Sequence, residues 1–332
     1  MSSRVLVTGA TGFIGHYIVR QLLASNHEVS VLVREGSSHF DSLKPFGDHV
    51  HICRGDINHV ESLEAACHGI DIVVHSAAMV SFDSGESRKV MKVNVEGTAN
   101  LINVCLDHQI KHFIHLSSIA ALGGMPGEMV IDESAVWMDK KVSLYSKSKH
   151  LAELEVWRGA AEGLAVTILN PSLVLGPWET SHHSMQIFKA MDRNLPFYPS
   201  GSNGCVDVRD VAQAVILSIE KKVFQERIII NGHNESYRDI LSGIAHKMGK
   251  KKPQWLFPKS GAQLGAMIIR MFSFITGRKH YFHSSVLKSI YTNTSFNNIK
   301  SINQLGLRYT PLDHTLHDVI SRFAELKNSV IA

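Results

Sequence analysis

Tyr145 and Lys149 stand four residues apart in the stretch LYSKSK, residues 144–149. On a helix, side chains at that spacing are neighbours on one face. A free phenol has a pKa near ~10, too high for easy proton exchange at neutral pH, and an adjacent ammonium lowers it. The pair therefore suggests an acid–base group in which Tyr145 gives or takes a proton. Lys147, two positions from each, points away, and Ser146 and Ser148 have no assigned chemistry.

The spacing of one Tyr and one Lys is weak evidence by itself, because an exposed Tyr beside a solvated Lys would look the same. The stretch VLVTGATGFIG, residues 5–15, strengthens it. Gly9 permits a tight turn after an apolar strand, Gly12 lets backbone approach a pyrophosphate, and Gly15 allows close helix-to-strand packing. The N–H groups of the following helix face the phosphates. This stretch predicts a dinucleotide site.

Arg34 ends the next predicted strand, VLVR, where a protein that uses NAD usually has an acid. A guanidinium pairs with a 2′-phosphate through two donors, so NADP(H) is the preferred cofactor. Glu35 follows directly and keeps NAD(H) possible. Lys44 is expected to be a solvated lysine. Asp56, in GDI (55–57), suits the adenine amino group, or equally a turn that caps the next helix.

Short apolar runs alternate with amphipathic helical segments over the first half of the chain. The alternation predicts a parallel sheet covered on both faces, a doubly wound α/β fold of Rossmann type. We expect a NAD(P)-binding domain over 1–170. A smaller, mostly helical substrate-binding region follows over 171–332, with part of 205–232 returning to the sheet. The predicted helices 87–107 and 142–161 and the strand 111–116 carry the residues of interest.

Composition excludes several classes of protein. The chain has 332 residues, 44% of them hydrophobic, and a net charge of +4 from scattered basic residues, which gives no nucleic-acid surface. Its four cysteines form no C-x-x-C pair, which predicts a reduced, cytoplasmic protein. No metal is expected, because His112 and His115 fall on a strand with His108 just before it. The apolar stretch 264–275 is too short to span a bilayer and contains Arg270, so membrane contact is not expected.

Several short motifs jointly resemble the extended short-chain dehydrogenase/reductase family, also called the NAD-dependent epimerase/dehydratase superfamily. They are TGATGFIG (8–15), HSAA (75–78), NVEGT (94–98), Ser117-Ser118, Tyr145-x-x-x-Lys149, NPSLVLGP (170–177) and DVRDVA (207–212). The resemblance runs from residue 4 to about residue 323. Its nearest branch contains dihydroflavonol 4-reductase and 3β-hydroxysteroid dehydrogenase.

The resemblance implies roles for particular residues. Tyr145 is the proton donor and acceptor, Lys149 also holds the nicotinamide ribose, and Ser118, in preference to Ser117, binds the substrate oxygen. Asn94 either positions a water behind Lys149 or only packs. The segment Pro171 to Val174 flanks the nicotinamide. The full cofactor set is Gly9, Thr11, Gly12, Phe13, Ile14, Gly15, Arg34, Asp56, Ile57, Ala77, Ala78, Tyr145, Lys149, Pro171 and Val174. The family also implies a homodimer through helices 87–107 and 142–161.

Three functions share these motifs. The first is an NADP(H)-dependent reductase of small lipophilic or aromatic ketones, favoured by Arg34, by Asn170-Pro171 and by an apolar tail. The second is a nucleotide-sugar epimerase or dehydratase with retained NAD, which commonly has V-Y-G where this chain has Ala121-Leu122-Gly123. Arg209 could bind its diphosphate or merely pair with Asp207 or Asp210. The third is a non-catalytic NADP(H) sensor, which usually lacks the Tyr or the Lys.

Overall fold

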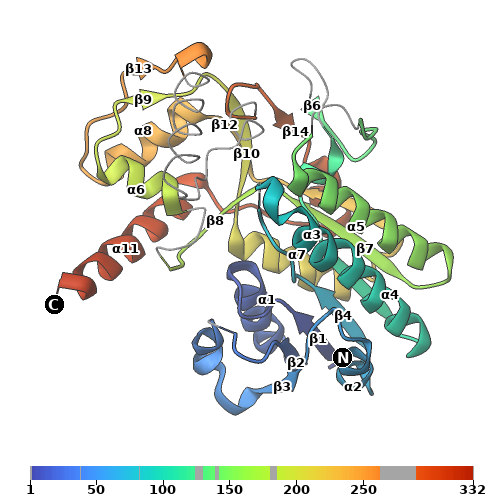
Figure 1. Ribbon diagram of the computed structural model, residues 1–332. Coiled ribbons are helices and arrows are strands. Elements are labelled where there is room, and N and C mark those ends of the chain that lie inside the picture. The colour runs from blue at the N-terminus through green and yellow to red at the C-terminus, as the bar shows by residue number, and fades with distance from the viewer. Residues whose placement is uncertain are drawn as a thin grey trace.

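A seven-stranded parallel sheet forms the centre of the protein in the computed structural model, which describes residues 2–37, 39–81, 83–123, 130–138, 142–179, 185–261 and 289–331. Its strand order is β11-β7-β5-β4-β1-β2-β3 (Figure 1). The strands are β1 (Arg4–Thr8), β2 (Glu28–Val33), β3 (Val50–Arg54), β4 (Ile72–His75), β5 (His112–Leu116), β7 (Val166–Pro171) and β11 (Glu226–Ile230). The order reverses beside β1, which is the doubly wound arrangement predicted from the sequence.

Helices cover both faces of this sheet, as Figure 1 shows. On one face, α1 (Phe13–Ala24) packs against α7 (Val208–Glu220) over a core that includes Val5 and Val7. On the other, α2 (Val60–Cys67), α4 (Gly97–Asp107) and α5 (Leu144–Ala161) pack over Leu6 and Phe113. Successive strand residues point to opposite faces, so the near-continuous apolar runs follow from a sheet buried on both sides.

The histidines of β5 lie on opposite faces of the sheet, as their strand spacing predicts. His112 bonds Thr167 at 2.7 Å, whereas the His115 ring lies 5.3 Å from the His75 ring. Among the residues that the structure describes, no three His, Cys, Asp or Glu side chains form a metal-binding group. All four cysteines are free thiols.

The helix expected over 87–107 is interrupted. The structure has α3 (Ser87–Met91), a π-helical turn η3 (Lys92–Glu96) and then α4. A π turn accommodates one residue more than an α turn, and such turns concentrate at functional sites. Asn94 sits in this turn with 2% of its surface exposed, which directs its side chain into the protein.

The second half of the chain combines small sheets with helices. A three-stranded sheet joins β8 (Leu173–Leu175), β10 (Ser202–Asp207) and β12 (His233–Ser236), beside α6 (Gln186–Asp192) and α8 (Tyr237–Lys247). Helix α11 (Leu312–Ile331) shares an apolar core with these helices. We call this part the substrate lobe; β11 leaves it and joins the main sheet beside β7.

The mostly helical character expected over 171–332 is only partly observed in the described residues from 252 onward. Two pairs of very short strands occur here, β13 (Trp255–Leu256) with β9 (Phe197–Tyr198), and β14 (Ser295–Phe296) with β6 (Val130–Ile131). The apolar stretch 264–275 lies outside the described residues. Within the described ranges, no helix combines the length and the apolar character that crossing a membrane requires.

Candidate active site

Ser118 and Tyr145 meet at the carboxyl edge of the sheet. Ser118 is the second residue after β5 and the N-cap of the short 3₁₀ helix η4 (Ile119–Leu122), where its Oγ accepts a bond from the Ala120 amide at 3.2 Å. Tyr145 lies in the first turn of α5, and its hydroxyl is hydrogen-bonded to the Ser118 side chain. Doubly wound folds bind their ligands at this edge. The structure therefore brings together the hydroxyl and the phenol that the sequence singled out.

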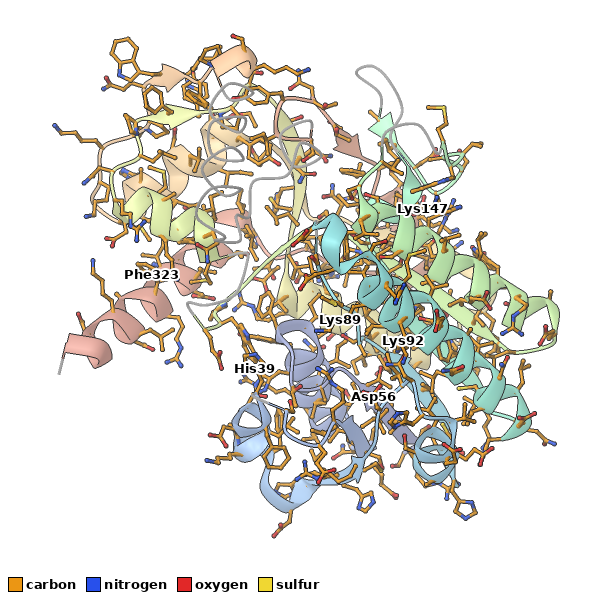
Figure 2. The ribbon with its side chains drawn as sticks, viewed as in Figure 1. His39, Asp56, Lys89, Lys92, Lys147 and Phe323 are labelled. Carbon is orange, nitrogen blue, oxygen red and sulfur yellow. The ribbon has the colours of Figure 1, made fainter. Side chains whose placement is uncertain are left out.

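Lys149 lies one turn further along α5 and is only 2% exposed. Its Nζ donates a 2.7 Å hydrogen bond to the Leu116 carbonyl, at the end of β5. Burial lowers the pKa of Lys149 to about 8, while the nearby carboxylate of Glu153 opposes that change. Lys149 is therefore an ammonium at neutral pH that loses its proton more readily than a free lysine, because a low-dielectric site disfavours charge. Lys147, by contrast, is exposed on the outer side of α5 (Figure 2).

A buried carboxylate, that of Glu153, hydrogen-bonds to several residues around this site. Glu153 is 1% exposed and lies one turn beyond Lys149 on α5. One of its oxygens accepts hydrogen bonds from the Ser117 hydroxyl and, at 2.6 Å, from the Asn170 amide. The other faces the Arg227 guanidinium at 3.4 Å. Asn170 also donates to the Ser118 carbonyl at 2.9 Å, so the carboxylate fixes the backbone that carries Ser118.

Asn94 connects the π turn to the helix of Tyr145. Its side chain exchanges two hydrogen bonds with the backbone of Met79, at 2.7 and 2.9 Å, and donates to the Ser148 hydroxyl at 2.9 Å. Ser148 donates in turn to the Tyr145 carbonyl at 2.8 Å. Asn94 thus contacts the backbone of Tyr145 through one intermediate and makes no direct bond to Lys149.

The N-terminus of α5 is capped by a residue that the sequence reasoning passed over. The Ser143 hydroxyl accepts from the Ser146 amide at 3.0 Å and bonds the Ser146 hydroxyl at 2.8 Å. A side-chain cap of this kind fixes the start of a helix. Because the first turn of a helix carries partial positive charge, it favours the phenolate form of Tyr145.

The sequence suggests a lowered pKa for Tyr145, and the structure differs. Burial raises the pKa of Tyr145 above its usual value, and the Ser118 hydrogen bond only partly opposes this. Lys149 is directed at the Leu116 carbonyl, so its charge is not the main influence on the phenol. The four-residue spacing is correct, but the ammonium acts on Tyr145 less than a surface pair would suggest.

The glycine loop has the geometry of a phosphate-binding turn. Gly9 adopts φ +74°, and a Cβ there would come within 2.6 Å of the Ala77 amide. A Cβ on Gly15 would lie 2.2 Å from the Gly9 carbonyl, so a larger residue could not close the turn. Helix α1 begins after Gly12 with no side-chain cap and no acid in its first turn. The first N–H groups of a helix have no partner inside it, and those of α1, at Phe13 and Ile14, fit an anionic pyrophosphate.

Arg34 lies just beyond β2 and is exposed. Its guanidinium forms no ion pair with any described residue, Glu35 included. Lys44 pairs with Asp41 at 3.0 Å on the surface, as expected for a solvated lysine. Arg34 is therefore available to an anionic ligand at this edge.

Asp56 and Ile57 follow β3, on the same edge of the sheet. Asp56 Oδ1 accepts bonds from the amide and side chain of Asn58, at 2.9 and 2.8 Å. Asp56 therefore stabilises the turn after β3 through this oxygen, and its other carboxylate oxygen could still accept a bond from a ligand. Ile57 is buried against Gly97, where a Cβ would lie 2.7 Å from the Ile57 side chain.

The other residues of the predicted cofactor set lie along the same edge. Thr11 accepts a bond from the Ser42 hydroxyl through its carbonyl, at 3.3 Å. Ala77 donates its amide to Thr8 Oγ1 at 3.3 Å, and Ala78 follows it exposed. Pro171 ends β7 and Val174 lies in β8. These positions are compatible with a dinucleotide that runs across the strand ends.

Arg209 is occupied by acids of the protein. It contacts Asp207 at 2.6 Å and Asp318 at 2.7 Å, and both carboxylates raise its pKa. Asp210 instead accepts two bonds from Thr310, at 2.8 and 2.7 Å. Of the two readings left open by the sequence, the structure shows the intramolecular pair with Asp207.

Sequence reasoning missed Glu153 and the part that Asn170 plays beside it. The available signal was spacing, because Glu153 continues the series of Tyr145 and Lys149 at a further four residues and so shares their helix face. A charged residue on a helix face that already carries two candidate catalytic residues is itself a candidate for the site.

The family model for the NAD dependent epimerase/dehydratase family matches residues 5–231. "Sterol demethylase protein B" of Methylococcus capsulatus is 28% identical over 327 residues, covering 96% of this chain and 98% of the relative. A "Putative dihydroflavonol 4-reductase" of Synechocystis is 27% identical and covers 97% and 95%.

Among solved structures, the crystal structure of gox2253 is 28% identical and covers 98% of both chains, with a TM-score of 0.85. The match to the family model spans the glycine loop, Ser118, Tyr145, Lys149 and Arg209 together. The chain belongs to the NAD dependent epimerase/dehydratase family, the extended branch of the short-chain dehydrogenases/reductases, and is an NAD(P)-dependent oxidoreductase.

Proposed function

We propose that this protein is an NADP(H)-dependent oxidoreductase that interconverts a ketone and a secondary alcohol on a small lipophilic or aromatic substrate. The observation that carries the proposal is the hydrogen bond between Ser118 and Tyr145 at the carboxyl edge, with the Lys149 ammonium buried one turn away. The bound nicotinamide would supply or accept the hydride. The chain itself must bind the substrate oxygen and move a proton to or from it.

In the proposed reaction, the carbonyl oxygen of the substrate accepts hydrogen bonds from Ser118 and Tyr145. As negative charge develops on that oxygen, the Tyr145 hydroxyl transfers its proton to it. Lys149 and the N-terminus of α5 stabilise the resulting phenolate. In the reverse direction the phenolate takes the proton from an alcohol, and Ser118 keeps the oxygen oriented.

The preference for NADP(H) rests on Arg34. An exposed arginine without an acidic partner among the described residues suits a 2′-phosphate, which it can bind through two donors. The preference for a lipophilic or aromatic substrate is supported by the similarity to a relative named "Putative dihydroflavonol 4-reductase" and by Asn170-Pro171 after the sixth predicted strand. The pairing of Arg209 with Asp207 and Asp318 weighs against a sugar-nucleotide diphosphate at that position.

Tyr145→Phe tests the mechanism. This variant should lower turnover by roughly 10²–10⁴-fold, because it removes the proton donor without changing the shape of the site. NADPH affinity, measured by fluorescence titration, should stay within about twofold of wild type. Turnover near the wild-type rate would overturn the role of Tyr145.

The cofactor that accompanies the purified protein tests the reaction class. NADPH oxidised on addition of hydrophobic ketones supports the reductase. NAD retained through purification, with no net NADPH consumption, would instead support an epimerase or dehydratase. Tight NADPH binding with no turnover on a broad ketone panel would support the sensor.

We also propose a homodimer and a cytoplasmic location. Helices α4 and α5 pack side by side, and α5 leaves Leu154 48% exposed, which suits a self-complementary helical interface. The free cysteines support a reducing compartment. Light scattering at micromolar concentration should give twice the 36.8 kDa chain mass, and a monomer mass would contradict the dimer.

A further inference from the structure

The β9–β13 pair lies at one end of the substrate lobe (Figure 1), and several large apolar side chains in and beside it are exposed. We call this surface the β9–β13 patch; it consists of Leu195, Phe197, Trp255, Leu256 and Phe257. Trp255 is 64% exposed and Leu256 52%, and the other three are exposed as well. Five exposed large apolar side chains on two short paired segments are unusual on a surface where such residues normally occur singly.

The patch is held in a fixed conformation by its backbone. Trp255 pairs with Phe197 across the two parallel strands, and Phe257 donates its amide to the Tyr198 carbonyl at 2.9 Å. Paired residues of neighbouring strands point to the same face, as do residues two apart. Phe197, Trp255 and Phe257 therefore share one face, and the rings of Phe197 and Phe257 lie 5.4 Å apart.

The charges within the two segments that form the patch are all of one sign. The two segments that form it, 193–200 and 249–261, contain no Asp or Glu. Their cations are Arg193, Lys250, Lys251, Lys252 and Lys259. Lys250 pairs with Asp192 at 3.4 Å, whereas the other four are exposed and form no ion pair with a described residue.

We propose that the β9–β13 patch docks the protein onto the surface of an anionic lipid bilayer. Segments that lie in a membrane interface typically combine exposed Trp, Phe and Leu with Lys and Arg. Their aromatic rings enter the headgroup region, and their cations bind anionic lipids. A second copy of the patch is a poor partner, because it would bring two sets of unpaired cations together. The proposal does not rest on the proposed reaction.

This docking differs from the sequence-based expectation of no membrane contact. That expectation rests on the apolar stretch 264–275, which is too short to span a bilayer, contains Arg270 and lies outside the described residues. A patch of side chains from two short strands does not depend on that stretch. It would hold the substrate lobe at a surface in which lipophilic ketones concentrate.

Co-sedimentation of the full-length protein with vesicles tests the proposal. Binding to phosphatidylcholine vesicles containing phosphatidylglycerol should exceed binding to phosphatidylcholine alone by about tenfold or more at low salt, and should fall as salt is added. The double variant Trp255→Ala/Phe257→Ala should lose at least about tenfold of that binding. Lys251→Gln/Lys252→Gln should lose binding only to the anionic vesicles.

Two control variants make the same kinds of substitution at surface positions outside the β9–β13 patch. Lys89→Gln/Lys92→Gln removes two exposed lysines from α3 and η3, away from β13 (Figures 1 and 2). Val136→Ala shortens an apolar side chain that is 74% exposed. Both controls should bind vesicles like wild type, and every variant should keep its NADPH affinity, which shows that it is folded.

Three results would overturn the proposal. One is the absence of binding to anionic vesicles at low salt. Another is equal binding by wild type and Trp255→Ala/Phe257→Ala. The third is a change of oligomeric mass in that double variant without a change in vesicle binding, which would assign the patch to a second copy of the chain.

Discussion

The proposed cofactor site has one cation at its catalytic end and another at its adenosine end, and the two differ in burial and in hydrogen-bond partners. At the catalytic end, Lys149 is buried, bonded to the Leu116 carbonyl and accompanied by the Glu153 carboxylate. At the adenosine end, Arg34 is exposed and has no acidic partner among the described residues. One cation is already fixed by the protein, and the other is available to a ligand.

This difference teaches which property each end controls. A buried charge with fixed partners sets a protonation state, so changes around Lys149 should alter turnover and its pH dependence. An exposed, unpaired cation offers ligand contacts and little else, so changes at Arg34 should alter cofactor affinity and leave the chemistry intact. Substitutions at Glu153 and at Arg34 separate these two effects.

Glu153→Gln should have a larger effect on turnover than any other substitution of a residue that does not contact the substrate. Lys149 is an ammonium below about pH 8 and neutral above it. Glu153 raises that pKa, so removing its charge lowers it and neutralises Lys149 at lower pH. The alkaline limb of the kcat/KM profile should therefore move to lower pH. We expect kcat at pH 7.5 to fall about tenfold or more, since a charged buried hydrogen-bond partner is lost.

Glu155→Gln is the matched control. It lies two residues further along α5 and pairs with Arg158 at 2.9 Å near the surface, so it should leave both kcat and the pH profile unchanged. NADPH affinity should be the same in both variants. A loss of kcat in Glu153→Gln with an unshifted pH profile would reduce Glu153 to a packing role and contradict its effect on Lys149.

The fold was predictable because its signals are local. The strands of the main sheet are short apolar runs, and β5 begins at His112 and ends at Leu116, where the sequence predicts a strand over 111–116. The π turn at Lys92–Glu96 was not predictable, since Asn94 is held there by the backbone of Met79, which is distant in the sequence. Strands β9 and β13 were missed because two residues cannot display a period of two.

The candidate site was predictable only in part, for a related reason. Tyr145 and Lys149 can be recognised in the sequence by their four-residue spacing on one helix. The partners of Glu153 come from three other places: Ser117 after β5, Asn170 in β7 and Arg227 in β11. Only the sheet order, in which β7 lies between β5 and β11, brings them together. Distant contacts of this kind leave no pattern in a single sequence.

Arg34→Ala tests the adenosine end and should have the smaller effect. NADPH affinity should fall by about 10- to 100-fold, because charge-assisted hydrogen bonds to the 2′-phosphate are lost. NADH lacks that phosphate, so its affinity should change by less than about twofold. Turnover at saturating NADPH should remain close to wild type, since Arg34 does not touch the reacting atoms. Isothermal titration with both cofactors measures the two affinities.

Lys44→Ala is the control for Arg34→Ala, because Lys44 is a nearby cation that already pairs with Asp41. It should leave both affinities unchanged, and the NADPH affinity of wild type should weaken as salt rises, as an exposed ionic contact requires. Equal losses of NADPH and NADH affinity in Arg34→Ala would mean that Arg34 supports the fold of this edge. Equal wild-type affinities for the two cofactors would instead make NAD(H) an equally good cofactor, and the contrast between the two ends would then lie in burial alone.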